Sequence, residues 1–386
     1  MSAQTIRLMP RPLGPRCEEL RAQVRAFLHD ELASGGFVPQ CDCWLKGVDR
    51  TFSRKLGARG WLGLTWPKRY GGGERSPFER FVVIEELLAA GAPVAGHWIA
   101  ERQMGPSVLR HGTEEQKQSL LPGIARGDFI FAGGYSEPDV GSDLAAVRTR
   151  AEEVAGGWRV TGTKVWTSQA HHADYMLVLC RTEAVGGDKH EGLSILIVQL
   201  PAAGLTMRPI PVLTGEHHFN EVHMDGVHVP DSMVLGAPGD GWKIITSELV
   251  LERSGPERFM STFPLLVEIV RRAQKEGADD RVLVTIGELV ARFRALRNMS
   301  IAVAAALEDG LSPGVEAAMV KDMGTRFEGD VAECARQLYE TQPSLDSTDR
   351  FDNYLAQSVL HTPSFTLRGG ANEILRGIIA RGLGVR

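Results

Sequence analysis

Three stretches of the chain concentrate residue types that can bind a planar, anionic ligand. Residues 135–144, Tyr-Ser-Glu-Pro-Asp-Val-Gly-Ser-Asp-Leu, follow a predicted strand, and this composition is typical of a rigid loop that offers N–H and hydroxyl groups to an anion. Residues 162–168, Gly-Thr-Lys-Val-Trp-Thr-Ser, place an aromatic ring before two hydroxyls, which suits a planar ring with polar edge atoms. Residues 368–376 begin a helix with glycines, so free N–H groups can approach a ligand closely. Each stretch, taken alone, is also compatible with an ordinary turn.

Two pairs of histidines and a run of glycines give weaker signals. His171-His172 and His217-His218 are adjacent in sequence, so in a strand their side chains would point to opposite faces and could not chelate one ion together. We therefore interpret them as surface imidazoles. The run at residues 71–73 could cradle a phosphate, but its position before a capped helix favours a flexible turn.

Composition excludes several classes of function. The formal charge is −5 and no block of five like charges occurs, which argues against nucleic acid or an anionic membrane as the main partner. The longest apolar runs, residues 193–198 and 301–307, are far shorter than a membrane span. The start of the chain lacks the apolar core of a signal peptide. Cys41 and Cys43 have no second ligand pair at metal spacing, so we predict no metal site, reduced thiols and a cytoplasmic protein.

The hydrophobic period changes twice along the chain. Helical signals, including capping boxes at Ser76 and Thr113, dominate residues 1–125. Short runs rich in β-branched and aromatic residues fill residues 126–236, and helical stripes return over residues 237–386. These changes predict an N-terminal helical domain, a central β domain and a C-terminal helical bundle.

In this order, the motifs resemble the acyl-CoA dehydrogenase family over essentially the whole chain. The Ser-Glu-Pro…Gly-Ser-Asp loop, the Gly-Thr-Lys-x-Trp-Thr-Ser strand, Phe-Asn-Glu-Val at residues 219–222 and Gly-Gly-Ala-Asn-Glu-Ile at residues 369–374 carry the resemblance. It implies an α+β fold whose central β domain is barrel-like and whose C-terminal bundle has four helices. It also implies FAD between the β domain and the bundle, with an acyl-CoA thioester beneath the flavin.

The resemblance assigns roles to residues in the first two stretches. Ser136 and Ser142 would contact the flavin and its pyrophosphate, with backbone groups of Tyr135 and Gly141 beside them. Trp166 would lie against the flavin, and Ser168 would stand near its N5 edge. The expected cofactor residues are therefore Tyr135, Ser136, Gly141, Ser142, Trp166 and Ser168. Hydroxyls near N5 would stabilise a reduced, anionic flavin.

The catalytic base is expected on the first helix of the bundle. Many family members carry a glutamate immediately before the glycine of the C-terminal motif, but here that position is Gly369. Isovaleryl-CoA and long-chain dehydrogenases instead place the base in a Leu-x-Leu-Glu-Arg context, which this chain has as Leu-Val-Leu-Glu252-Arg253. The resemblance thus implies Glu252 as base and Ser142, Arg253 and Gly369 as contacts of the substrate. The alternative for Glu252 is a solvated helix carboxylate.

Two segments depart from the pattern of homotetrameric relatives. An Arg-x-x-Phe-Gly segment and a Gln-x-x-Gly-Gly-x-Gly segment normally reach the neighbouring subunit's FAD, but residues 276–282 and 337–343 lack both. Some actinobacterial dehydrogenases of sterol side chains resemble this and form α2β2 heterotetramers. We therefore expect a homo- or heterotetramer that passes electrons to an electron-transferring flavoprotein. A flavin oxidase or oxygenase that uses O2 and a non-catalytic subunit stay open as alternatives.

Overall fold

A computed structural model describes residue 6, residues 8–183 and residues 186–385, and for residues 249–252 it describes only the backbone. The chain divides into two compact units. The sheet unit consists of Gly47–Glu74 and Val94–Leu249, and the helical unit consists of Met1–Lys46, Arg75–Pro93 and Val250–Arg386. Among the helices described, none is both long enough and apolar enough to cross a membrane.

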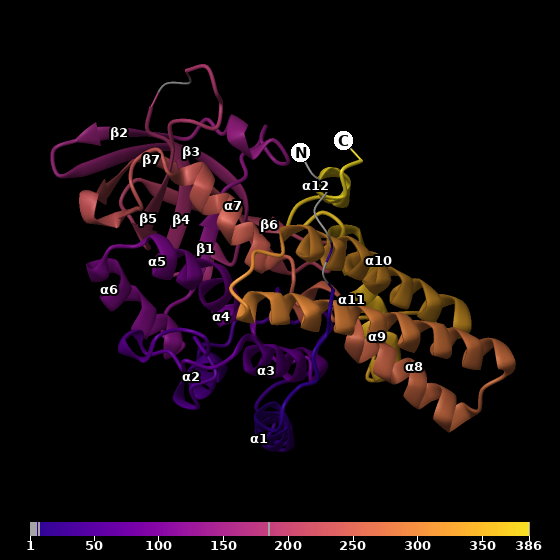
Figure 1. Ribbon diagram of the computed structural model, residues 1–386. Helices are drawn as coiled ribbons and strands as arrows, with labels where there is room; N and C mark the ends of the chain where they lie inside the picture. Colours follow the sequence, from indigo (N-terminus) through magenta and orange to yellow (C-terminus); the bar gives the residue numbers. More distant parts are fainter. Residues whose placement is uncertain (1–5, 7, 184–185, 386) are drawn as a thin grey trace. The chain divides into compact units, whose positions relative to one another are not determined.

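The sheet unit is built on one eight-stranded sheet (Figure 1). Its strands follow the order β6-β7-β3-β2-β4-β5-β8, and β1 pairs with β4 in parallel. The strands are β1 (Phe131–Gly134), β2 (Arg150–Val154), β3 (Gly157–Ser168), β4 (Tyr175–Arg181), β5 (Leu193–Gln199), β6 (Leu205–Pro211), β7 (His217–Pro230) and β8 (Val234–Leu235). The α-helices are α2 (Arg50–Ala58), α4 (Ala95–Ile99), α5 (Gly105–His111), α6 (Glu114–Ala125) and the start of α7 (Gly241–Glu252), and a π-helix, η2 (Ala100–Met104), follows α4. Single 3-10 turns are η1 (Lys68–Tyr70), η3 (Leu144–Ala146), η4 (Ala170–His172) and η5 (Asp231–Met233).

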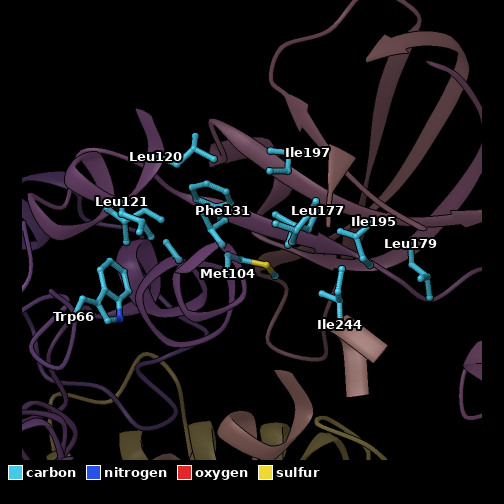
Figure 2. Packing of buried hydrophobic residues seen from close by; sticks show 14 of the residues in the cluster. Trp66, Met104, Leu120, Leu121, Phe131, Leu177, Leu179, Ile195, Ile197 and Ile244 are labelled. Atoms are coloured by element: carbon cyan, nitrogen blue, oxygen red, sulfur yellow. The ribbon is translucent and has the colours of Figure 1, made fainter. Parts of the chain in front are cut away.

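Strands β4 and β5 are buried on both faces, which explains their nearly continuous apolar sequences. Alternate residues enter two different cores. Leu177 and Ile195 belong to a cluster with Leu121 of α6 and Trp66, which lies in the loop before η1, as Figure 2 shows. Their neighbours Val178 and Leu196 instead pack with residues of β3 and β7. The sheet is therefore enclosed between helices on one face and its own curled strands on the other.

The helical unit contains the long helices of the C-terminal half. Helices α8, α9, α10 and α11 pack side by side (Figure 1). The α-helices are α1 (Pro15–Ala33), α3 (Pro77–Ala89), α8 (Phe263–Glu276), α9 (Asp280–Glu308), α10 (Gly314–Leu338), α11 (Arg350–Phe365) and α12 (Asn372–Gly382), and η6 (Pro256–Arg258) is a 3-10 turn. The predicted capping boxes are confirmed at the starts of α3 and α6. All five cysteines are free thiols, and four of them are buried.

Candidate active site

The loop after β1 is closed by a buried carboxylate that sequence reasoning did not single out. Glu137 is 7% exposed and accepts hydrogen bonds from the backbone N–H groups of Arg148 and Thr149 at 2.7 and 2.9 Å. Its other partner is Lys164 on β3, whose Nζ donates to Glu137 Oε1 at 2.8 Å. Glu137 therefore fixes the loop at both of its ends and joins it to the sheet.

The two buried charges stabilise one another. Burial lowers the pKa of Lys164, and the nearby Glu137 charge opposes that effect. Burial would also raise the pKa of Glu137, but the charge and hydrogen bond of Lys164 and the bonds from Thr149 and Arg148 keep this pKa below its usual value. The ion pair therefore offsets part of the cost of burying each group. Lys164 Nζ also donates to the Tyr135 carbonyl at 3.1 Å, so the pair fixes the start of the loop.

The expected flavin residues of this loop lie on an accessible surface. Gly141 and Ser142 are exposed, and Tyr135 and Ser136 are half-buried. A Cβ placed on Gly141 would meet no atom within 4 Å. The backbone N–H of Val165 donates to the Ser136 carbonyl at 2.9 Å, which joins this loop to the residue before Trp166. The structure therefore brings the first two motif stretches together.

Trp166 presents a large aromatic surface to solvent. It is 59% exposed and adopts a left-handed φ of 56°, a conformation that costs energy in a bulky residue. The register between β3 and β7 shifts between Lys164 and Thr167, so Trp166 lies at a bulge. The rings of Trp166 and Phe219 pack edge to face, with 5.9 Å between their centroids. Ser168, half-buried, pairs with Phe219 at the end of β3.

Glu248 on α7 is engaged by neighbours from two other elements. The Tyr135 hydroxyl lies 3.0 Å from both oxygens of Glu248, and Ser107 Oγ donates to Oε2 at 3.2 Å. Glu248 is only 2% exposed. This carboxylate therefore holds Tyr135, whose backbone opens the predicted flavin loop.

The expected substrate residues of the helical unit also meet. Arg253 Nε donates to the Gly369 carbonyl at 3.2 Å, and Gly369 has a left-handed φ of 71°. Arg368, the preceding residue, lies 2.7 and 2.8 Å from the two oxygens of buried Asp42. Glu252 is the last residue of α7, and its side chain lies outside the described part of the chain. Its predicted role is therefore not tested by this geometry.

Two weaker sequence signals have structural explanations. The N–H groups of Gly72 and Gly73 donate to the carbonyls of Pro67 and Gly63, each at 3.2 Å, so the glycine run is a packed turn and not a phosphate cradle. Asp42, between the two cysteines, pairs with Arg368.

Comparison with known proteins decides the family. Models of the N-terminal, middle and C-terminal domains of acyl-CoA dehydrogenases match residues 15–128, 132–227 and 239–384. The chain belongs to the acyl-CoA dehydrogenase family. It is an FAD-dependent oxidoreductase of acyl-CoA thioesters, and the predicted α+β fold is confirmed.

Named relatives of this acyl-CoA dehydrogenase cover nearly its full length. Acyl-CoA dehydrogenase IpdE1 of Mycobacterium tuberculosis is 36% identical over 94% of this chain and 96% of its own. The structure named "Tcur3481-Tcur3483 steroid ACAD" is 32% identical, covers 97% of this chain and 98% of that one, and superposes with a TM-score of 0.83. The ChsE4-ChsE5 complex of Mycobacterium tuberculosis is 29% identical over 98% and 99% of the two chains, with a TM-score of 0.80.

The residues of the sheet unit fit the cofactor of the dehydrogenase. An exposed indole offers a flat apolar face for a ring system. The open space at Gly141 permits close approach of a ligand to the backbone, and the exposed Ser142 hydroxyl is available as a donor. Tyr135, Ser136, Gly141, Ser142, Trp166 and Ser168 would hold FAD.

Proposed function

We propose that this dehydrogenase removes the α-proton of its acyl-CoA substrate with Glu252. The α-proton of a thioester is weakly acidic, so its removal requires a carboxylate that is shielded from water and has a raised pKa. The observation that carries the assignment is the contact between Arg253 and the Gly369 carbonyl at 3.2 Å. Because Glu252 directly precedes Arg253, its backbone adjoins the loop in which other family members carry the base.

The two alternative carboxylates on either side of Glu252 in the sequence, Glu248 and Glu257, already contact other groups of the protein. Glu248, one turn earlier on α7, has both oxygens within 3.0 Å of the Tyr135 hydroxyl. Glu257 is 0% exposed and lies beside Arg258, with 3.9 Å between Oε1 and Nε. Both environments leave Glu252 as our candidate for the base.

FAD, when bound, supplies the hydride acceptor for the β-hydrogen of the acyl chain. Loss of the α-proton and the β-hydride leaves a trans-2-enoyl thioester. Contacts with Ser142, Arg253 and Gly369 would orient the substrate, and an electron-transferring flavoprotein would take the two electrons. One structural relative is named a steroid ACAD, so we infer that the acyl group is derived from a sterol side chain. The free thiols accord with a reducing compartment such as the cytoplasm.

The change of Glu252 to Gln tests the base. Glu252→Gln keeps size and polarity but cannot accept the proton, so we expect turnover to fall at least ~10²-fold. Bound flavin should be retained, while bleaching of its absorbance by acyl-CoA should become correspondingly slow. Stopped-flow absorbance under anaerobic conditions measures both.

Glu248→Gln is the matched control, because it makes the same chemical change one turn away and retains an acceptor for Tyr135. We expect its turnover to stay within a few-fold of wild type. Wild-type bleaching rates in Glu252→Gln, or a larger loss in Glu248→Gln, would reject the assignment of the base.

We also propose that the dehydrogenase assembles with a homologous, non-identical chain as an α2β2 tetramer. The segments that would reach a neighbour's FAD are missing at residues 276–282 and 337–343. Leu283, Val284 and Val290 on α9 are 56, 60 and 40% exposed, which provides an apolar helix face for a partner. Two structural relatives each carry the names of two proteins together. The start of α10 offers less apolar surface to a partner, because Val315, Ala317, Ala318 and Val320 are buried within the chain.

A further inference from the structure

Asn220 on β7 is a buried amide that binds three neighbours. It is 0% exposed. Its Nδ2 donates to the Thr167 carbonyl at 3.0 Å and lies 3.0 Å from His171 Nδ1, and its Oδ1 lies 2.8 Å from His217 Nε2. Thr167 directly follows Trp166, so the amide supports the turn that presents the indole.

The histidines around this amide form a stack that the sequence interpretation missed. The rings of His171 and His217 are nearly parallel with centroids 3.8 Å apart, and His172 lies 4.1 Å from His171. The prediction of surface imidazoles holds for the exposed His172 and His217 and fails for the buried His218. His171 and His172 lie in the 3-10 turn η4 and not in a strand. The turn brings them against β7.

Hydrogen-bond chemistry fixes the protonation of these rings. Both amide hydrogens are on Nδ2, so His171 Nδ1 must accept and must carry no proton. The amide oxygen can only accept, so His217 Nε2 must carry one. A proton on His171 Nδ1 would oppose the amide hydrogens and force Asn220 to rotate. Rotation would leave the buried Thr167 carbonyl without this donor.

The turn beside Asn220 needs such support. Trp166 and Gln169 both adopt a left-handed φ of 56°, which costs energy in residues other than glycine. The N–H of Gln169 donates to the His218 carbonyl at 2.8 Å. Asn220 and this backbone bond therefore hold the strained segment from both sides.

We propose that Asn220, fixed by His171 and His217, is a positioning residue that locks the Trp166–Thr167 turn for FAD binding. The inference rests on the proposed placement of FAD against Trp166. Asn220 acts through the turn. A turn that is already rigid loses less conformational entropy when the ligand binds, so it binds the ligand more tightly.

Burial among other imidazoles lowers the pKa of His171. Burial, followed by the neighbouring histidines, lowers the pKa of His171 to about 4, while the Asn220 bond opposes this. Arg50 on α2 donates to the His172 carbonyl at 2.6 Å and is paired with Asp174. The groups around His171 are His172, His217, His218 with its partner Glu216, and Arg50 with Asp174. Since His171 titrates near pH 4, the wild-type amide keeps its orientation throughout the neutral range.

Fluorescence titration of flavin-free protein with FAD at pH 7 tests the proposal. His171→Leu removes the acceptor and Asn220→Asp removes the donor, so we expect the dissociation constant to rise about tenfold or more in each. His171→Asn restores an acceptor near the Nδ1 position and should bind FAD within about threefold of wild type. His172→Asn, on the exposed neighbouring ring, is the matched control.

NMR of 15N-histidine-labelled, flavin-free protein gives a readout that is independent of FAD. We expect His171 to be unprotonated on Nδ1 at pH 7 in wild type, and its pKa to rise by at least about one unit in Asn220→Asp, since a carboxylate favours the imidazolium. A proton on His171 Nδ1 in wild type would overturn the proposal even if the Asn220→Asp variant failed to fold.

The outcomes separate the two proposals. If wild type binds FAD and His171→Leu and Asn220→Asp bind it as tightly as His172→Asn does, the inference about Asn220 is wrong and the proposed function stands. If wild type binds no FAD, the proposed function fails and this inference fails with it.

Discussion

Glu328 on α10 is a fully buried carboxylate whose two oxygens have different surroundings. Oε1 accepts a hydrogen bond from the Ser261 N–H at 2.7 Å, while Oε2 lies 3.8 Å from Arg368 Nη2. Burial raises the pKa of Glu328 to about 7, although Arg368 and Ser261 act to lower it, and Asp42 adds to the rise.

Glu328 should make the folded state less stable as pH rises. The ordinary carboxyl pKa is 4.5, so between about pH 4.5 and 7 the folded chain holds a proton that the unfolded chain has released. Stability falls across this window, by on the order of 3 kcal/mol. Glu328→Gln keeps the acceptor for Ser261 without a charge, so the free energy of unfolding in urea should decline less from about pH 5 to pH 8. A decline as steep as that of wild type would contradict the assigned pKa.

The Glu137–Lys164 pair shows why part of the site escapes sequence reasoning. The motifs predicted residues for ligand binding, and the structure joins Ser136 to Val165, the residue before Trp166. The motifs did not predict the buried Glu137–Lys164 pair that supports this loop. These residues are 27 positions apart, so their contact depends on how the strands align. One signal was present: Lys164 lies in phase with buried Trp158 and Val160 on β3, and a lysine on a buried face requires an anionic partner.

At the scale of elements, the loop between α11 and α12 is held by a buried lysine of α10. Lys321 Nζ donates to the carbonyls of Thr366 and Gly370 at 3.1 and 2.7 Å and to Asn372 Oδ1 at 2.7 Å. Lys321 is 0% exposed. This lysine therefore fixes both sides of Gly369.

Lys321→Met keeps the length of the side chain and removes its charge and donors. Bonds to a charged group contribute about 1.5–3 kcal/mol each, so we expect the free energy of unfolding to fall by at least about 3 kcal/mol. Because the loop carries Gly369, KM for acyl-CoA should also rise. Lys275→Met on α8, where the side chain is exposed, is the control and should change neither quantity. A stable Lys321→Met protein with unchanged KM would refute the role of this lysine.

Elements with strong local signals were predicted, and those that depend on distant pairing were not. Capping boxes in the sequence predicted the starts of α3 and α6. The sequence of strand β2, Arg-Ala-Glu-Glu-Val, gives no clear strand signal, because it contains only one β-branched residue and is mostly exposed. It is a strand because all five residues pair with β3, and single-sequence patterns do not contain that information.

At the scale of the whole molecule, the exposed face of α9 should control assembly. Leu283→Asp combined with Val284→Asp places charges on this face, so a complex with the homologous chain should dissociate to smaller species in mass photometry. Because both side chains are exposed, we expect the free energy of unfolding to change by no more than about 0.5 kcal/mol each. Flavin content per chain should fall with dissociation.

Val38→Asp is the matched control, since Val38 is 76% exposed but lies outside α9. It should leave mass and flavin content unchanged. An intact complex in the double α9 variant would place the interface elsewhere, and one tightly bound FAD per chain in an active homo-oligomer would reject the heteromeric assembly.

The buried thiols affect how well the enzyme resists inactivation during turnover. An enoyl thioester is an electrophile, and thiolates add to its β-carbon. Burial raises the pKa of Cys41 and of Cys180 to about 12, and it raises the pKa of Cys17, Cys43 and Cys334 as well. Only the thiolate is a strong nucleophile, so these cysteines stay protonated and react slowly. A dehydrogenase with this arrangement is protected from alkylation by its own product.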